Sequence, residues 1–258
     1  MNNKKSVYIL FVALLMGGFF LAGCNKTLPT YPVASLNVVN TLPTSAPLIL
    51  VQGSITAVIG NFSGIGALSY GSTAVLTPMS GSEALYALQK NADTVAVNAQ
   101  GGGTFMFDGS LSFAAGSLYS LFITGADTSN PDFVFVQDTV AQRTDSTVGV
   151  RFVNLSTGSN PVSVDIKGQA NGSVVPVLAY KGITGFMSFP TTSAISSYIF
   201  EFRDAGSGSL LASYTLSGVN TNSSTVANTV LFRNLTIALI GQPAGGMVAQ
   251  TCIRVNSF

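Results

Sequence analysis

Residues 36–53, LNVVNTLPTSAPLILVQG, and residues 150–168, VRFVNLSTGSNPVSVDIKG, follow the same plan. Four pairs of equivalent residues lie 114 positions apart: Leu36 and Val150, Val39 and Val153, Asn40 and Asn154, and Pro47 and Pro161. In each copy an apolar run is followed by a polar loop with a proline and then by a second apolar run, which is the pattern of two strands and a turn. The chain therefore contains two copies of one β-module.

The rest of each copy also predicts strands. They are expected at residues 94–98, 104–107 and 118–124 in the first copy, and at 198–203, 210–216 and 230–240 in the second. Only residues 81–90 show a trace of helical spacing. Short strands separated by Gly, Asn and Ser clusters are typical of sandwiches, so we expect an all-β chain with two tandem antiparallel immunoglobulin-like β-sandwich modules.

The most polar stretch after the N-terminal segment is DTVAQRTDST, at residues 138–147, which we take as the boundary between the copies. The expected organisation is a signal peptide over residues 1–23 and a lipidated tether over 24–33. The first sandwich module is then expected over residues 34–141 and the second over 142–258.

The N-terminal segment has the pattern of a bacterial signal peptide. Lys4 and Lys5 precede an apolar run over residues 7–21, and about 15 residues is the length of a signal-peptide core but short of the roughly 20 that span a membrane. The run ends in Leu21-Ala22-Gly23-Cys24, which resembles the lipobox of bacterial lipoproteins. The resemblance implies that signal peptidase recognises the first three of these residues, and that the cysteine thiol receives a diacylglyceryl group and becomes the mature N-terminus.

Acylation at Cys24 predicts a protein bound to a membrane without a spanning helix, because each buried methylene contributes about 0.8 kcal/mol. Asn25 stands where an aspartate signals inner-membrane retention in enteric bacteria, so we expect a lipid-anchored protein of the cell envelope, with the outer membrane favoured over the inner. Cys252 then has no intramolecular partner and is expected to be a buried apolar side chain near the last strand.

The composition excludes several classes of protein. The 258 residues include no histidine and no tryptophan, and the missing histidine removes the commonest general base and the commonest zinc ligand. Charged residues make up 8% of the chain and the net charge is +1, so a nucleic-acid partner held by phosphate neutralisation is not expected. The sequence predicts neither a cofactor nor an enzymatic activity.

Residues 150–168 resemble the opening of the modules of domain-of-unknown-function family 4397 (DUF 4397). The resemblance rests on Val150-Arg151-Phe152-Val153-Asn154, Ser156, Pro161, Val164-Asp165-Ile166 and Gly168, and on Gly116 and Tyr119, which resemble the family's late Gly-x-x-Tyr hairpin. It implies sandwich modules of secreted and surface-anchored bacterial proteins, with no established enzymatic activity. The chain departs from the family where Asn40 and Asn154 replace a frequent histidine, and where the first copy lacks a counterpart of Asp165.

Two kinds of candidate site carry oxygen-rich side chains. A calcium site is suggested by Asp127, Ser129, Asn130 and Asp132, although the spacing does not match an EF-hand and the same residues are typical of a plain turn. Three Asp-Ser/Thr-apolar triplets resemble the acceptor of a bacterial periplasmic O-glycosylation system. They make Thr94, Thr139 and Ser146 candidate glycosylation sites.

Acid–base chemistry has little support in the sequence. Glu201 and Asp204 fall at a strand end and at the start of a turn, where they are expected to form a surface pair. Asp165 alternates with apolar neighbours and therefore points to the opposite face, where it either anchors a loop or meets water. A hydrolase with an unusual carboxylate site is accordingly the third interpretation of the chain.

The first interpretation is a non-enzymatic protein for adhesion, scaffolding of surface complexes or ligand binding, in contact with the membrane through its lipid and with a protein or glycan of the envelope. Its candidate contact loops are residues 41–47, 126–132 and 155–161, because sandwiches often bind through end loops. The second interpretation is a carbohydrate-binding protein that stacks sugars on exposed Tyr70 and Tyr180, although the absence of tryptophan argues against it.

Overall fold

The computed structural model describes residues 32–53, 67–89, 104–140, 143–192, 194–220 and 228–256, and residues 32–258 form one compact unit. The described residues build strands and no helix, which confirms the all-β prediction. Among them there is also no helix long and apolar enough to cross a membrane.

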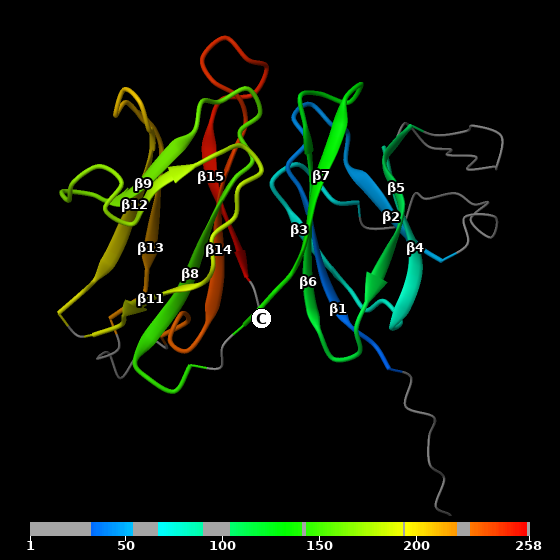
Figure 1. Ribbon diagram of the computed structural model, residues 1–258, viewed down its shortest axis with the longest axis horizontal. Helices are drawn as coiled ribbons and strands as arrows, with labels where there is room; N and C mark the ends of the chain where they lie inside the picture. The colour runs from blue at the N-terminus through cyan, green and yellow to red at the C-terminus, as the bar shows by residue number, and fades with distance from the viewer. Residues whose placement is uncertain are drawn as a thin grey trace, which may run out of the picture. The chain divides into compact units, whose positions relative to one another are not determined.

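Strands β1–β7 form the first pair of sheets (Figure 1). One sheet has the order β3-β1-β6-β7 and the other the order β2-β4-β5. The strands are β1 (Ser35–Asn40), β2 (Leu48–Gln52), β3 (Thr73–Leu76), β4 (Gly81–Gln89), β5 (Phe105–Phe113), β6 (Leu118–Gly125) and β7 (Pro131–Gln137). Leucines and aromatic residues from both sheets share one apolar core, so these strands make a sandwich, called module 1 below.

Strands β8–β15 form the second pair of sheets, with the orders β11-β8-β14-β15 and β10-β9-β12-β13. The strands are β8 (Thr147–Asn154), β9 (Val162–Ile166), β10 (Val175–Leu178), β11 (Met187–Pro190), β12 (Ser197–Asp204), β13 (Leu210–Ser217), β14 (Asn234–Ile240) and β15 (Thr251–Asn256). Their shared core is rich in aromatic rings, and the ring centroid of Phe152 lies 5.1 Å from that of Phe200. This sandwich is called module 2.

The sheets that contain β1 and β8 have the same strand order, with β8, β11, β14 and β15 in the places of β1, β3, β6 and β7, while the second sheet of module 2 has one more described strand, β10, than that of module 1. The sheets depart from the antiparallel expectation at one position in each module, because β1 runs parallel to β6 and β8 runs parallel to β14. Parallel neighbours need a long connection in place of a hairpin. The strands of the second sheet supply that connection in both modules.

Several local predictions change on inspection of the fold. Residues 81–89 form β4, not a helix, because the segment pairs with β2 on one side and β5 on the other. The turn at Gly116, which has φ +70°, joins β5 to β6 in a different sheet and is therefore not a hairpin. The strand expected at residues 230–240 begins at Asn234, and the one expected at 94–98 lies outside the described residues.

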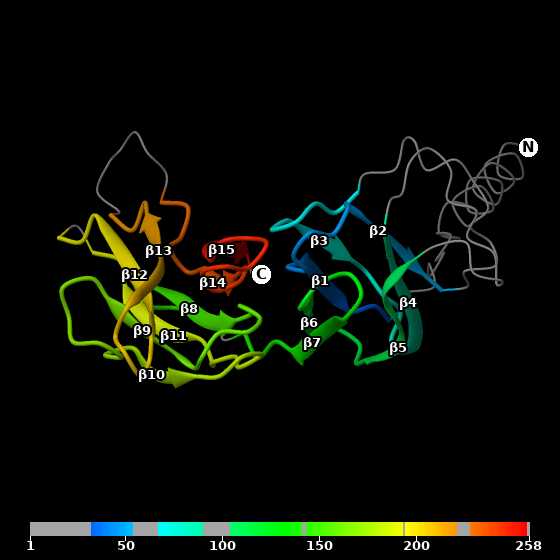
Figure 2. The same cartoon turned by 90° about the horizontal axis from the view of Figure 1, so that it is seen from above.

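The sheets that contain β1 and β14 face each other in Figure 2, and a third apolar cluster draws its residues from both modules. Val39 and Phe122 of module 1 meet Val153, Leu155 and Ala238 of module 2, all of them fully buried. These side chains lie on the faces of the two inner sheets that point away from their own cores. The modules therefore pack against each other through the sheets that contain β1 and β8.

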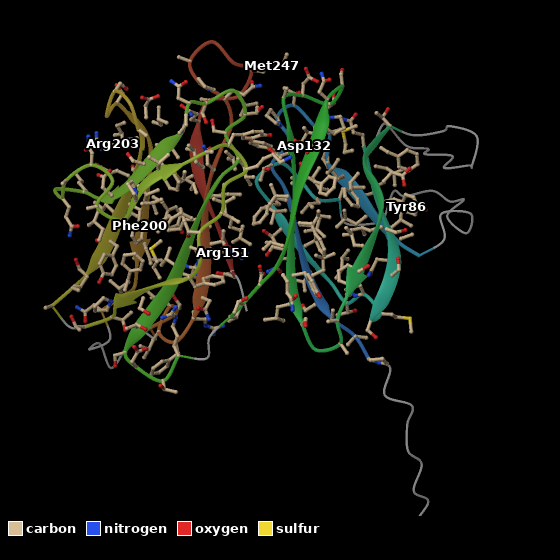
Figure 3. The ribbon with its side chains drawn as sticks, in the orientation of Figure 1. Tyr86, Asp132, Arg151, Phe200, Arg203 and Met247 are labelled. Atoms are coloured by element: carbon tan, nitrogen blue, oxygen red, sulfur yellow. The ribbon has the colours of Figure 1, made fainter. Side chains whose placement is uncertain are left out.

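A buried ion pair lies at the same interface (Arg151 is labelled in Figure 3). The Arg151 Nη1 atom is 2.6 Å from the Asp138 Oδ1 atom, and the two side chains are 3% and 0% exposed. Arg151 also donates to the hydroxyls of Ser120 and Thr236. The polar stretch taken from the sequence as the boundary between modules thus begins with a residue that is part of their interface.

Candidate functional site

Loops from both modules emerge at one end of the sheets. Because β1 is parallel to β6 and β8 is parallel to β14, the loops that follow these four strands leave from the same end (top of Figure 1). Thr124, at the end of β6, donates to the Leu155 carbonyl just after β8 at 3.5 Å, so the two ends adjoin. We call residues 126–130, 155–161 and 241–250 the loop face.

In each module one asparagine holds the loop that follows the first strand, which is residues 41–47 in module 1 and residues 155–161 in module 2. Asn154 Nδ2 donates to the Leu178 carbonyl and the Ser159 hydroxyl, and its Oδ1 accepts from the Ser156 N–H. Asn40 makes the same three bonds, to Leu68, Ser45 and Leu42. An amide suits this position because it carries two donors and an acceptor at once. The asparagines fix the conformation of the predicted contact loops 41–47 and 155–161.

Two contacts bring loops of different modules together. Gln242 Nε2 donates to the Ala126 carbonyl at 2.9 Å. Lys181 Nζ lies 2.8 Å from the Asp132 Oδ2 atom (Asp132 is labelled in Figure 3). The predicted loop 126–132 of module 1 is therefore fastened to module 2 at both of its ends.

The β14–β15 loop, residues 241–250, was missed by the sequence analysis. Its sequence GQPAGGMVAQ carries a Pro/Gly cluster, and such clusters mark loops, so the signal was present. Gly241 has φ +89°, and a Cβ there would lie 2.3 Å from the Ala249 carbonyl oxygen. Gln242 Oε1 accepts from the Met247 N–H at 2.7 Å. The loop is thus folded back on itself and presents Met247, which is 72% exposed (Figure 3).

The loop face is nearly free of charge. Asp127 is the one charged residue in its three segments, and its Oδ1 atom accepts hydrogen bonds from the Ser129 and Asn130 N–H groups. The remaining residues offer amides, hydroxyls, backbone groups and the methionine. Such a surface suits a partner that is recognised by hydrogen bonding and shape, with little contribution from charge.

The four residues proposed for calcium divide between two other functions. Asp127 closes its own loop through the bonds to Ser129 and Asn130. Asp132 pairs with Lys181: burial alone would raise the pKa of the Asp132 carboxyl, but the hydrogen bonds from Lys181 and from the Phe133 N–H lower it below its usual range. Within the described ranges no three acidic, cysteine or histidine side chains gather as a metal site. The calcium site stays a prediction that the Lys181 ammonium disfavours.

Tyr70 and Tyr180 are not the exposed stacking platforms that the glycan interpretation requires. Both are half-buried. Tyr70 packs on the cluster between the modules, where burial raises its pKa to about 12, and its buried hydroxyl has no hydrogen-bond partner among the described residues. The Tyr180 hydroxyl lies 3.5 Å from the Thr124 hydroxyl of the other module. The tyrosines occupy equivalent positions, two residues after Leu68 and Leu178, whose carbonyls accept from Asn40 and Asn154. Both tyrosines lie at the interface between the modules.

The expected surface pair of Glu201 and Asp204 is wrong. Glu201 is 6% exposed and lies directly opposite Asp165 on β9, which is 1% exposed. Arg203 joins both carboxylates, with its Nε atom 3.4 Å from Asp165 Oδ2 and its Nη2 atom 2.5 Å from Glu201 Oε2. Asp165 is on the opposite face from Val164, as the alternation predicted, but it is buried beside an arginine and does not meet open water. In the part of the chain that the structure describes, its Oδ1 atom has no hydrogen-bond partner.

In module 1 the positions equivalent to Asp165, Glu201 and Arg203 carry apolar or aromatic side chains instead of charged ones (Tyr86 and Arg203 are labelled in Figure 3). Ile49 and Val51 occupy the places of Ser163 and Asp165, while Leu88 and Tyr86 face them as Arg203 and Glu201 do in module 2. The four residues of module 1 form a separate apolar cluster with Phe105. These two sheets have therefore diverged in chemistry, although β2 pairs with β4 in the same register as β9 pairs with β12.

Asp204 fastens a loop in a way that predicts a pH dependence. The hydrogen bond from Asn160 of the loop face and those from Ser207 and Gly206 lower the Asp204 pKa to about 2. A carboxyl whose pKa falls on folding stabilises the protein above its ordinary pKa of 3.8 and loses that contribution as the pH falls towards 2. We expect the melting-temperature difference between wild type and Asp204→Asn, measured calorimetrically, to shrink between pH 4.5 and pH 2. A difference that stays constant over this interval contradicts the assignment.

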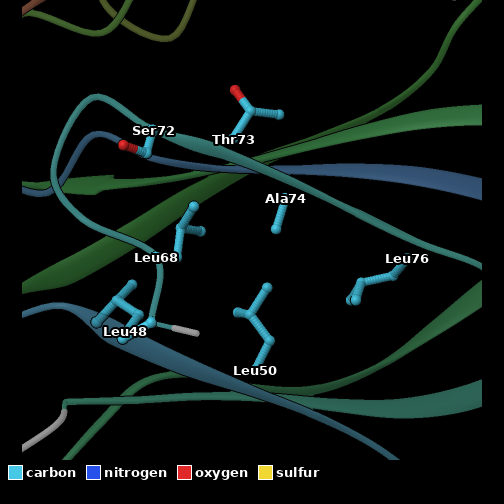
Figure 4. A pocket seen from close by; sticks show the side chains of 8 residues that line it. Leu48, Leu50, Leu68, Ser72, Thr73, Ala74 and Leu76 are labelled. Carbon is cyan, nitrogen blue, oxygen red and sulfur yellow. The ribbon is translucent and has the colours of Figure 1, made fainter. Parts of the chain in front are cut away.

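Module 1 also contains an apolar cavity of about 340 Å³ (Figure 4). Leucines make up half of its lining: Leu48 and Leu50 of β2, Leu76 of β3, and Leu68, which precedes β3. Among the described residues of its wall, the polar side chains are those of Ser72 and Thr73, and none is ionisable. The cavity belongs to the space between the two sheets of module 1.

The remaining predicted sites are placed as follows. Leu21, Ala22, Gly23 and Cys24, together with Thr94, lie outside the described residues. Thr139 and Ser146 are exposed, but the Asp138 carboxylate before Thr139 is bound by Arg151. Cys252 lies in β15 and packs against the module 2 core, where burial raises its thiol pKa to about 12. That environment agrees with an unreactive apolar side chain.

Comparison with known proteins adds the following findings. No family model and no curated protein matches the chain. Two streptococcal structures, on α-glucan recognition by family 41 carbohydrate-binding modules from virulence factors and on α-glucan binding by a virulence factor, share 12% identity with it. They cover 85% and 81% of this chain and 96% and 93% of their own, with TM-scores of 0.25 and 0.24. A candidate adhesin from Bacteroides ovatus shares 11% identity, covers 88% of this chain and 94% of its own, and has a TM-score of 0.20.

Proposed function

We propose that this chain is a non-enzymatic, lipid-anchored binding protein of the bacterial cell envelope that meets its partner through the loop face. The observation that carries the proposal is the joining of the two modules, which turns loops of both into one surface through the bonds from Gln242 to Ala126 and from Lys181 to Asp132. A surface shared between two fixed modules suits adhesion or scaffolding. The neutral chemistry of its segments suits an uncharged partner surface.

The direction of the chain supports the same function. The described chain begins at Pro32, before β1, at the end of the sheets opposite the loop face (Figure 1). If Cys24 carries the acyl chains, residues 24–32 can extend about 30 Å at most, at about 3.5 Å per residue. A tether from Cys24 then joins the described chain at the end of the strands opposite the loop face.

The ionisable groups support a binding function over catalysis. The carboxylates of Asp138, Asp165 and Glu201 are each held by an arginine in a buried setting. An acid or base in catalysis must reach its substrate, and these three groups serve packing within the protein. The half-buried tyrosines likewise favour a protein partner over a stacked glycan.

The anchor is tested by the Cys24→Ala variant in cells that process lipoproteins. The wild-type protein is expected in the membrane fraction with a mass increment for acyl chains, and the variant is expected to lack that increment. An unmodified wild-type Cys24 overturns the anchor.

The binding face is tested by photo-crosslinking in intact cells. A photoreactive residue at Met247 is expected to give a discrete adduct, while the matched probe at Ala115, in the exposed β5–β6 turn at the other end, gives none. Protease and glycosidase treatment of the adduct then separates a protein partner from a glycan. Equal labelling from both positions, or none from either, contradicts the proposed face.

A further inference from the structure

The two inner sheets are equivalent surfaces of one repeated fold. Asn37 lies opposite Ser120 in the β1–β6 pair, and Arg151 lies opposite Thr236 in the β8–β14 pair. Asn37 and Arg151 are 114 residues apart, as are the four pairs found in the sequence. Asn37 therefore corresponds to Arg151, and Ser120 corresponds to Thr236.

The contacts between these sheets are reciprocal. Asn37 of module 1 donates to the backbone carbonyl of Asn256, at the end of β15 in module 2. Its counterpart Arg151 in module 2 donates to Asp138, at the end of β7 in module 1. Each module thus reaches from its first strand to the last strand of the other, which is the arrangement found at the twofold interface of a homodimer.

Arg151 is where the two halves of this interface differ. Its guanidinium donates to Thr236 of its own module and to the equivalent Ser120 of the other module, so it lies between corresponding positions. Its charge is met by Asp138, at the end of β7. Val136 pairs with Ser120 as Val255 pairs with Thr236. In the sequence Ser257, which lies outside the described residues, stands two places after Val255 as Asp138 stands two places after Val136.

Pairing of like modules would therefore bury uncompensated charge. Two copies of module 2 would bring two arginines together with serine where an aspartate is needed. Two copies of module 1 would bury two aspartates with asparagine where an arginine is needed. Truncating one member of a buried charged pair weakens association strongly, because the other charge stays buried and unpaired.

We infer that, on sheet β3-β1-β6-β7, the face turned away from the core of module 1 is a recognition surface for the equivalent face of module 2. The Arg151–Asp138 pair selects the unlike module as the partner of this face. The association is a property of the two faces, since among the described residues its apolar cluster and its ion pair involve none from Thr139 to Arg143. This inference concerns the assembly of the protein and does not depend on the function of the loop face.

The test uses the full chain with a protease site inserted between Ala141 and Gln142, cut after folding. Native mass spectrometry is expected to find a complex of one module 1 fragment with one module 2 fragment, and no complexes of like fragments. The Asp138→Ala variant is expected to raise the dissociation constant of the cut complex by about 30-fold or more. The Glu83→Gln variant, which changes a carboxylate outside the interface, is expected to leave it unchanged.

A second variant keeps the test decisive if Asp138→Ala prevents folding. Exchange of the pair for apolar side chains, Asp138→Leu with Arg151→Met, removes the charges and is expected to preserve the complex while allowing like fragments to pair. Free monomeric fragments from the cut wild-type sequence overturn the recognition surface. Complexes of two like fragments from the cut wild-type protein overturn the selective function of the ion pair. The absence of like-fragment complexes from the cut double variant overturns it as well.

Discussion

Replacing Asp138 by alanine in the intact chain is expected to lower the free energy of unfolding by about 3–5 kcal/mol, because the Arg151 guanidinium is left charged in an almost fully buried setting. The loss also removes the acceptor of the Ser120 hydroxyl, which donates to Asp138 Oδ2 at 2.7 Å. Chemical denaturation followed by circular dichroism measures the change. A loss below about 1 kcal/mol, the size expected for a surface pair, contradicts the buried ion pair.

The double variant Asp138→Leu with Arg151→Met is the matched control. Burying two charges costs solvation free energy that their attraction only partly returns, so apolar replacement of a whole pair is often neutral or stabilising. We expect the double variant to recover most of the stability that the single variant loses. A double variant as unstable as the single one would show that packing around Asp138, and not its charge, holds the site.

The second large effect is expected in the aromatic core of module 2. Phe152 is fully buried, with its ring centroid 5.1 Å from Phe200 and 6.0 Å from Phe202. Phe152→Ala is expected to cost about 3–5 kcal/mol, from lost apolar burial and from the cavity left among rigid rings. Leu210→Ala, at a side chain that is 51% exposed, is expected to change stability by about 0.5 kcal/mol. Similar losses in both variants, by the same denaturation assay, contradict the core assignment.

The duplication is the part of the fold that the sequence predicted best. Matching residues such as Asn40 and Asn154 are equivalent because each closes a loop with the same three hydrogen bonds, and backbone needs of this kind leave a local trace in the sequence. The strand expected at residues 198–203 is likewise present as β12, with alternate side chains Tyr198, Phe200 and Phe202 in the core. Local periodicity is sufficient for such elements.

Features that depend on contacts across sheets or modules could not be predicted in this way. Asp138 looked like the start of a polar linker because its partner Arg151 lies on another strand, and Tyr70 and Tyr180 looked exposed because their neighbours come from the other module. Glu201 was assigned the wrong partner, since Asp165 is close only through the β9–β12 register. The parallel pairs were hidden for the same reason.

The parallel pairing of β1 with β6 bears on how the molecule responds to mechanical force. The two strands are joined over six residue pairs, from Ser35 with Leu118 to Asn40 with Ile123. With an anchor before β1 and a partner at the loop after β6, a pulling force acts along the strands. It shears the whole hydrogen-bonded ladder at once, where an antiparallel hairpin pulled from its open end would unzip one bond at a time. The fold therefore places a strand pair that is loaded in shear directly between the proposed tether and the proposed partner.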